Sequence, residues 1–499
     1  MQRRVALLVC LVFATGLAFS GGTVGQEEGL LVEGFESGDF SSLPWAWRST
    51  GERYWAVTDS DAHTGSFSAQ STCSAYLVVE LTFTEAGYID FYYKIVGAPV
   101  PFRLAFYIDG DRQDAWSEDT DWTQASFPVC EGTHVLVWGA SHCWSSRPVV
   151  WLDDIRFPDA SASTFVPAAT CEQQPQVTLF PGQSIQDAIE SVEEGAVIKL
   201  EPGKYEEHLK IRKSVTICGS GAHDTAIVGG DGGGYAIEVR GGPSTKVWID
   251  GLTIESERGI LTYGQSDLTI SQCVIKGPLS LAGRDTISEC MLKGHIDLNN
   301  GSEASIINST LVGADISLPD CSPFRPNPTP LVLTLTNSIM VGGGINSHHR
   351  AKIEGIDFCG ELHIEGNRLL YTWGIIVESD YVYGHVDWGC CTRKDEYGRC
   401  LSRGRGSSVY IEGNVISESW GSGIELGTCV YAQVMNNVIS YSLDNGIYVY
   451  STSWSTIRGN EVFGNGWYGI SIHLADDGSS SVSGNRVYEN GSGDYYRWP

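Results

Sequence analysis

Two glutamates, two tyrosines and a histidine stand at matching places in a repeated phrase near the C-terminal end of the chain. They are Glu378, Glu425, Tyr448, Tyr450 and His473, and each alternates with aliphatic residues. Because neighbouring residues of a strand point to opposite sides, we expect these five side chains to share one exposed face. Glu378 and Glu425 would lie one coil apart with an offset of two residues, so their backbones would be ~8 Å apart. Carboxyl groups about 6.5–9.5 Å apart can serve as the acid and base of an inverting glycosidase.

Aromatic residues lead into the same face. Trp373, Trp420, Trp467 and Tyr468 precede the strands that carry it. Flat rings can stack on pyranose rings, and carboxylates can bind sugar hydroxyls. Trp373, Trp420, Tyr448, Tyr450, Trp467 and Tyr468 are therefore the predicted ligand-binding residues, and Glu378, Glu425 and His473 the predicted catalytic ones. The alternative is a solvated face with scattered aromatic residues.

A repeat of fixed period must position these residues. Asn414, Asn437, Asn460 and Asn485 each follow a Gly or Asn, and Gly-Ile follows nine residues after each of the first three. Such a period indicates a solenoid of stacked parallel strands, in which each coil buries its apolar side against its neighbours. We expect the asparagines to stack and hydrogen-bond one another at a bend.

Two cysteines occupy equivalent places in shorter coils of the same solenoid. Cys273 and Cys290 each end a similar phrase, Ile-Ser-Gln-Cys and Ile-Ser-Glu-Cys. Because neighbouring strands lie ~4.8 Å apart, these residues are predicted to stack as a ladder of thiols. Disulfides are expected elsewhere, with Cys390, Cys391 and Cys400 crowded into one loop.

The first third of the chain has a different pattern. Strands with alternating apolar residues, such as 88–94, 102–109 and 149–155, are separated by turn signals, which is typical of an antiparallel β-sandwich. The predicted organisation is all-β: a signal peptide over 1–25, a jelly-roll sandwich over 28–158, a linker over 159–176 and a parallel β-helix over 177–499. A helix beginning after Ser184 is expected to cap the N-terminal end of the β-helix.

Composition limits the partners. The chain has 499 residues, 60 of them Asp or Glu and 32 Lys or Arg, giving a net charge of -28. This excess of carboxylates argues against nucleic acid and anionic membranes. Arg3 and Arg4 followed by a short apolar run are typical of a secretory signal, and no later segment is long enough to span a bilayer. We expect the mature protein outside the cell, on its surface or in the periplasm.

The entry to the solenoid resembles a known superfamily. The segments 182–189, 200–205 and 215–219 are similar to the start of a right-handed parallel β-helix of the pectin-lyase-like superfamily, and the Gly-Asn and Gly-Ile phrases resemble NosD-type repeats. The resemblance covers about residues 176–499 and implies fold more than chemistry, since one scaffold hosts many functions. The catalytic motifs of polygalacturonases, pectin methylesterases and pectate lyases are absent from the sequence.

The front domain resembles bacterial jelly-roll modules of the carbohydrate-binding and MAM-like kind. The segments 33–40, 63–68 and 151–157 carry this resemblance. In such modules acidic residues from the first and last strands hold a structural calcium, which implies Glu36, Asp153 and Asp154 as ligands here. Ordinary surface acids are the alternative interpretation.

Three functions follow as hypotheses. The first is a secreted glycan-binding protein that engages extracellular polysaccharide or a cell-surface glycan. The second is a polysaccharide hydrolase or lyase in which Glu378 and Glu425 are acid and base, assisted by His473 or Tyr448. The third is a structural or adhesive solenoid at the cell surface.

Overall fold

The computed structural model describes most of the chain from residue 31 onward. The described residues are 31–43, 45–49, 55–72, 75–98, 102–141, 148–158, 160–161, 174–229, 234–299, 301–318, 331–342, 344–346, 360–377, 391–394, 400–403, 407–427, 430–450, 454–473 and 480–498. The predicted signal peptide lies outside them. The chain divides into two compact units, Met1–Phe165 and Val166–Pro499. In the described ranges no helix is both long and apolar enough to cross a membrane.

The first unit is an antiparallel β-sandwich, as predicted. One sheet contains β1 (Leu31–Glu33), β3 (Ala56–Thr58), β4 (Ser68–Ser71), β6 (Gly87–Val96), β9 (Thr120–Val129) and β11 (Val149–Phe157). The other contains β2 (Ala46–Ser49), β5 (Ala75–Phe83), β7 (Leu104–Ile108), β8 (Asp111–Trp116), β10 (Gly132–Ala140) and β12 (Ala160–Ser161). Alternate residues face inward, and the rings of Phe91, Phe106 and Trp138 pack with centroids 4.7–5.6 Å apart.

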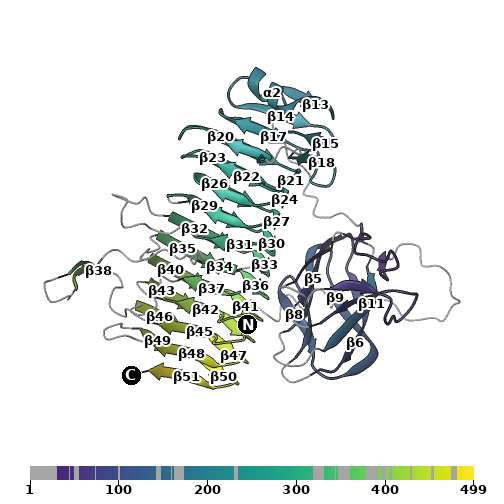
Figure 1. Ribbon diagram of the computed structural model, residues 1–499, viewed down its shortest axis with the longest axis vertical. Coiled ribbons are helices and arrows are strands. Elements are labelled where there is room, and N and C mark those ends of the chain that lie inside the picture. The colour runs from purple at the N-terminus through teal and green to yellow at the C-terminus, as the bar shows by residue number, and fades with distance from the viewer. Residues whose placement is uncertain are drawn as a thin grey trace. The chain divides into compact units, whose positions relative to one another are not determined.

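The second unit is a parallel β-helix, which confirms the predicted fold class (Figure 1). Its coils contribute successively to three parallel sheets, named C, D and E here. Sheet C contains β13 (Val177–Leu179), β14 (Ala196–Leu200), β17 (Val215–Cys218), β20 (Lys246–Asp250), β23 (Asp267–Ser271), β26 (Arg284–Ser288), β29 (Glu303–Ile307), β32 (Leu331–Thr336), β35 (Gly360–Glu365), β40 (Ser407–Glu412), β43 (Val430–Met435), β46 (Trp454–Arg458) and β49 (Ser481–Ser483).

Sheets D and E follow the same order. Sheet D contains β15 (Gly203–Glu206), β18 (Thr225–Val228), β21 (Thr253–Glu255), β24 (Val274–Lys276), β27 (Met291–Lys293), β30 (Thr310–Val312), β33 (Ile339–Val341), β36 (Arg368–Leu370), β41 (Val415–Ser417), β44 (Val438–Ser440), β47 (Glu461–Phe463) and β50 (Arg486–Tyr488). Sheet E contains β16 (Leu209–Ile211), β19 (Ile237–Val239), β22 (Ile260–Thr262), β25 (Leu279–Leu281), β28 (Ile296–Leu298), β31 (Asp315–Ser317), β34 (Gly344–Asn346), β37 (Ile375–Val377), β42 (Ile424–Leu426), β45 (Ile447–Tyr450), β48 (Tyr468–His473) and β51 (Gly493–Trp498). A separate antiparallel pair is formed by β38 (Cys391–Lys394) and β39 (Cys400–Arg403).

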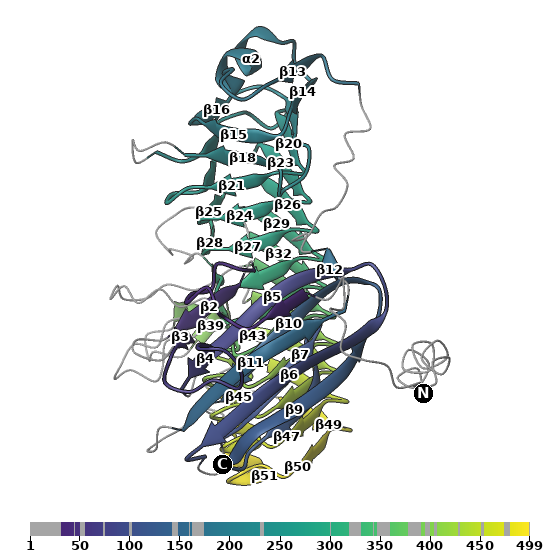
Figure 2. The same ribbon diagram turned by 90° about the vertical axis from the view of Figure 1, so that its right-hand side faces the viewer.

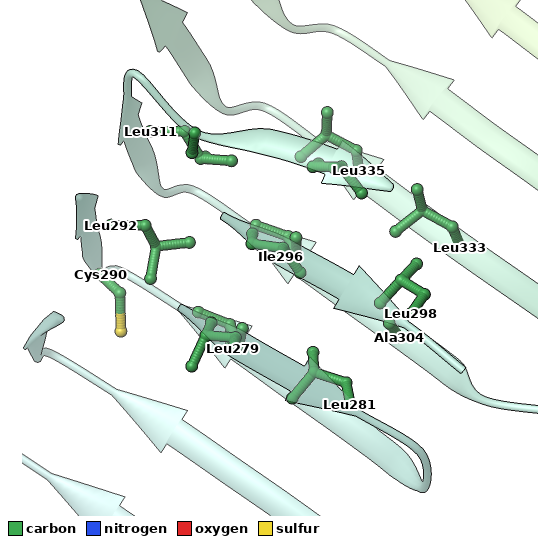
Figure 3. Packing of buried hydrophobic residues seen from close by; sticks show 14 of the residues in the cluster. Leu279, Leu281, Cys290, Leu292, Ile296, Leu298, Ala304, Leu311, Leu333 and Leu335 are labelled. Atoms are coloured by element: carbon green, nitrogen blue, oxygen red, sulfur yellow. The ribbon is translucent and has the colours of Figure 1, made fainter. Parts of the chain in front are cut away.

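Aliphatic side chains fill the inside of the coils, in register from strand to strand. Leu279 of β25 pairs with Ile296 of β28, and Leu281 with Leu298. All four are buried and stack along the axis (Figure 3). Because each inward side chain lies over its counterpart, outward side chains must form rows as well.

Helix α2 (Ile185–Ser191) covers the first coils of the β-helix and lies at one of its ends, as predicted (Figures 1 and 2). The Oγ of Ser184, the N-cap residue, accepts a hydrogen bond from the Asp187 backbone N–H at 3.1 Å. The Glu207 carboxylate accepts two more, from Ile185 at 2.7 Å and Gln186 at 3.0 Å. The free N–H groups of the helix are thus satisfied by the solenoid that it covers.

A ladder of side chains, buried from Cys273 to Asn460 and half-buried at Asn485, runs along the corner between sheets C and D. The backbone N–H of each member donates to the side chain of the next, at 3.4 Å for the first thiol pair and 2.8–3.2 Å for the others. Its members are Cys273, Cys290, Ser309, Ser338, Asn367, Asn414, Asn437, Asn460 and Asn485. Both the asparagine column and the stacked thiols are confirmed. Cys273 and Cys290 are free, and burial raises the pKa of the Cys273 thiol.

The residue before each ladder member has a left-handed backbone. Its φ lies between 48° and 70° in every case. Glycine and asparagine tolerate this conformation best, which explains the Gly-Asn and Asn-Asn phrases of the sequence. The bend therefore requires a pair of residues, one for backbone conformation and one for the ladder.

Replacing a ladder asparagine should destabilise the β-helix strongly. The Asn437 Oδ1 accepts from the Asn414 N–H at 2.9 Å, and its Nδ2 donates to the Ile411 carbonyl at 2.9 Å. Asn437→Ala leaves these buried groups unpaired and should lower the free energy of unfolding by roughly 3 kcal/mol. Urea unfolding followed by circular dichroism measures this loss. The control is Asn436→Gly, which suits the φ of 57° there and should cost little; equal effects of the two changes would contradict the role of the ladder.

A buried carboxyl should make the β-helix less stable as pH rises. Asp285 pairs in register with the buried Leu268 and Ala304, so it points inward, and burial raises its pKa to about 6. The folded state then holds the proton more tightly than the unfolded state, so stability falls as pH rises from about 4 to 6. Asp285→Asn removes this loss and should be more stable than the wild type above pH 6, by about 2–3 kcal/mol.

Thermal unfolding of wild type and Asp285→Asn between pH 3.5 and 7.5 measures the difference. Asp315→Asn, an outward residue of β31, is the matched control. A constant difference between wild type and Asp285→Asn across this pH range would refute the assignment.

Candidate functional site

Outward side chains of sheet E form the rows that the repeat predicts. Glu425, Tyr448, Ser471 and Tyr496 lie in register on consecutive strands β42, β45, β48 and β51. His473 lies beside Tyr450 in the neighbouring row. Ser471 is buried in its row although its position is outward, whereas His473 is exposed. Glu378 lies outside the described residues, so its spacing from Glu425 stays a prediction.

Aromatic rings cluster on these strands. Tyr448 and Tyr450 stack with centroids 5.2 Å apart, and Tyr468, the first residue of β48, stacks on Tyr496 at 4.7 Å. The His473 ring lies 6.2 Å from that of Tyr496. We name this group, together with Glu425, the sheet E face. It combines ring surfaces with carboxylate, imidazole and phenol groups that can hydrogen-bond a polyhydroxylated ligand.

The predicted tryptophans lie in the turns before these strands. Trp373 and Trp420 pack edge to face at 5.7 Å, and Trp420 is half-buried. Trp373 and Trp467 are 47% and 53% exposed, which is unusual for so large an apolar side chain. They are therefore available for contact with a partner next to the sheet E face.

Two residues of this region were missed by the sequence reasoning. Asp444 occupies the place of Trp467 one coil earlier, and burial raises the pKa of its carboxyl. Counting two residues back from each Gly-Ile phrase would have found it. Tyr496 belongs to the last coil, which lacks that phrase, so only the register of β48 with β51 reveals it.

The three predicted metal ligands of the sandwich are brought together around Gly34. A Cβ at Gly34 would lie 3.8 Å from Asp154 Oδ1, 4.0 Å from Asp153 Oδ1 and 3.8 Å from Glu36 Cγ. Asp153 is fully buried, and burial raises its pKa to about 6. Carboxylate oxygens are the donors that calcium prefers, so the chemistry of this set suits the ion.

These carboxylates already accept hydrogen bonds. Asp153 Oδ2 accepts from the His63 N–H at 2.8 Å, and Glu36 accepts from Ser66 and Phe67 at 2.9–3.1 Å. Within the described ranges, no three Asp, Glu, His or Cys side chains are arranged ready to hold a metal ion. An ionised carboxylate has about four lone-pair sites, so these hydrogen bonds leave sites that a calcium ion would use.

A second cluster on the sandwich lies beside these acids and was also missed. The His63 ring stacks on Tyr92 at 3.6 Å and meets Trp122 edge to face at 5.8 Å. The Lys94 ammonium lies 3.1 Å from both Asp61 and Asp121. These residues come from β6, β9 and the loop before β4, so no single stretch of sequence signals the cluster.

Comparison with known families and structures gives the following. The family model described as periplasmic copper-binding protein (NosD) matches residues 338–496, the coils that carry the sheet E face. No curated protein matches the chain. A solved structure of the catalytic unit of the GH87 α-1,3-glucanase from Streptomyces thermodiastaticus strain HF3-3 is 15% identical, with a TM-score of 0.46, covering 92% of this chain and 98% of that one.

Two further structures are similar. A GH87 α-1,3-glucanase catalytic domain in complex with nigerose is 13% identical over 92% of this chain and 96% of its own, with a TM-score of 0.47. The CBM22-1 xylan-binding domain of Paenibacillus barcinonensis Xyn10C is 21% identical over 25% of this chain and 90% of its own, with a TM-score of 0.20. At these TM-scores we take no chemistry from either likeness.

We propose that Glu36, Asp153 and Asp154 bind calcium, and calcium should then stabilise the sandwich. At a concentration 100 times the dissociation constant, the gain is about 2.7 kcal/mol. Differential scanning calorimetry with and without 1 mM calcium chloride measures it. Asp153→Asn should abolish the rise in unfolding temperature. The control is Asp109→Asn, which should retain the rise, because Asp109 has a positive φ that suits Asn. If calcium does not raise the unfolding temperature of the wild type, these residues are ordinary hydrogen-bonding acids.

Proposed function

We propose that the protein binds polysaccharide outside the cell or in the periplasm, and that the sheet E face is its binding surface. One observation carries the proposal: rings from three consecutive strands, Tyr448, Tyr450, Tyr468, His473 and Tyr496, gather beside Glu425. A contiguous patch of aromatic rings at a protein surface commonly marks an interaction site. A sugar chain offers apolar C–H faces to the rings and hydroxyls to the polar groups.

The surrounding turns support the same ligand. The exposed Trp373 and Trp467 extend the aromatic surface beyond the strands. Sheet strands and ladder hold these side chains on a rigid scaffold, so little conformational entropy is lost on binding. The net charge of -28 favours a neutral glycan over an acidic one, because carboxylates on both partners would repel.

Affinity electrophoresis of the full chain tests this proposal. Migration is compared in gels containing mixed-linkage β-glucan, xyloglucan, galactomannan, α-1,3-glucan solubilised by carboxymethylation, or polygalacturonate. Tyr448→Ala/Trp467→Ala should weaken retention at least about tenfold, because aromatic contacts at a binding centre carry most of the affinity. Tyr488→Ala, on sheet D, is the control.

Retention of the double variant equal to that of the wild type would contradict the sheet E face as the binding surface. The same gels can be assayed for reducing ends. Release of reducing ends that is lost in Glu425→Gln would show that the surface cleaves the glycan as well as binding it.

A further inference from the structure

Sheet C presents a second outward row, on a different side of each coil from the sheet E face. Its members pair in register from one strand to the next, from β17 to β49. They are Thr216, Trp248, Thr269, Thr286, Ser305, Thr334, His363, Tyr410, Gln433, Thr456 and Ser481, named the central row here. All of them are partly or largely exposed.

The central row contains no carboxylate, lysine or arginine, although the chain has 60 acidic and 32 basic residues. The rows on either side do contain them: Asp267, Arg284 and Glu303 on one, Glu365, Glu412 and Arg458 on the other. The central row is therefore a neutral, hydrogen-bonding track between charged margins. Such a row offers hydroxyl donors and acceptors along its length without a charge among them.

Several hydroxyls of the row are free to bind. In the described part of the chain, Thr216, Thr269, Thr286, Ser305 and Thr334 make no side-chain hydrogen bond. Charged neighbours pair among themselves instead, as in Arg284 Nε to Asp267 Oδ1 at 2.9 Å. Each free hydroxyl can donate one bond and accept two, and adjacent ones repeat every ~4.8 Å along the axis.

Rings interrupt the hydroxyls at intervals. Trp248 is 44% exposed and lies in register between Thr216 and Thr269, and its Nε1 donates to Ser271 Oγ on the next strand at 2.8 Å. His363 and Tyr410 stack at 4.9 Å with an interplanar angle of 8°, and Tyr410 is 38% exposed. Hydroxyls with intermittent rings match a polymer that alternates hydroxyl groups with apolar C–H faces.

We propose that the central row of sheet C binds a neutral, linear polysaccharide laid along the axis of the β-helix. An acidic polymer would meet the carboxylates of the margins, and a peptide strand would need free backbone edges, which the paired strands of sheet C do not offer. This surface is additional to the sheet E face and does not depend on it.

Affinity electrophoresis of the full chain tests this proposal by comparing the wild type with the triple variant Thr269→Val/Thr286→Val/Thr334→Val. Valine keeps the shape and β-branch of threonine and removes the hydroxyl, so the fold should persist, which the thermal midpoint verifies. Losing three hydrogen bonds should weaken retention on a neutral glycan at least about tenfold. Thr269→Glu should also weaken it, whereas Ser280→Glu, in the same coil but on sheet E, should not.

The outcomes separate the two surfaces. The triple variant and Tyr448→Ala/Trp467→Ala are measured in parallel. Loss of retention in the triple variant supports binding by the central row, whatever the result for the sheet E face. Retention of the triple variant equal to that of the wild type overturns it, even if the sheet E variant loses binding. Failure of the wild type to bind any neutral polysaccharide, or retention by polygalacturonate alone, also overturns it.

Discussion

A hydrogen-bonded column of side chains helps to hold the β-helix in register. From Cys290 to Asn485, a side chain at one corner of each coil accepts a hydrogen bond from a backbone N–H of the coil before it. Each asparagine also returns a bond to a buried carbonyl, as Asn460 does to Val434 at 2.9 Å. Without these partners the tight bend would leave buried N–H and C=O groups unpaired. The ladder changes from thiol to hydroxyl to amide along the axis, so its position is more constant than its chemistry.

Because the ladder and the inward aliphatic side chains set the register, outward side chains on every sheet must fall into straight rows. A row is a ready-made surface for a long, regular ligand, and its composition decides which one. The sheet E face gathers rings around Glu425 over a few coils, whereas the central row of sheet C spreads hydroxyls over many. Two different binding chemistries can thus share one rigid scaffold.

The sandwich builds its sites differently. Its acidic cluster joins Glu36 near β1 to Asp153 and Asp154 on β11, more than a hundred residues later. The neighbouring group of His63, Tyr92, Trp122 and Lys94 comes from two strands and a loop. The contacts within these two clusters depend on antiparallel pairing of strands that are distant in the sequence, and no repeat in the sequence predicts them. The calcium ligands were inferred from a resemblance, and the aromatic cluster was not inferred at all.

The sequence alone determined the solenoid, its asparagine and thiol columns, its capping helix and the alternation that places Glu425, Tyr448, Tyr450 and His473 outward. It could do so because a repeat turns spacing along the chain into position in space, and because burial forces alternate residues inward. Tertiary structure decided what the period does not encode. Because the coils differ in length, the sequence does not show that Trp248, Thr334 and Tyr410 share a row. The last coil lacks the phrase that would mark Tyr496. The register of β26 places Asp285 on the inward side of its strand. Those positions follow from strand pairing, which couples residues by hydrogen bonds between coils and not by their distance along the chain.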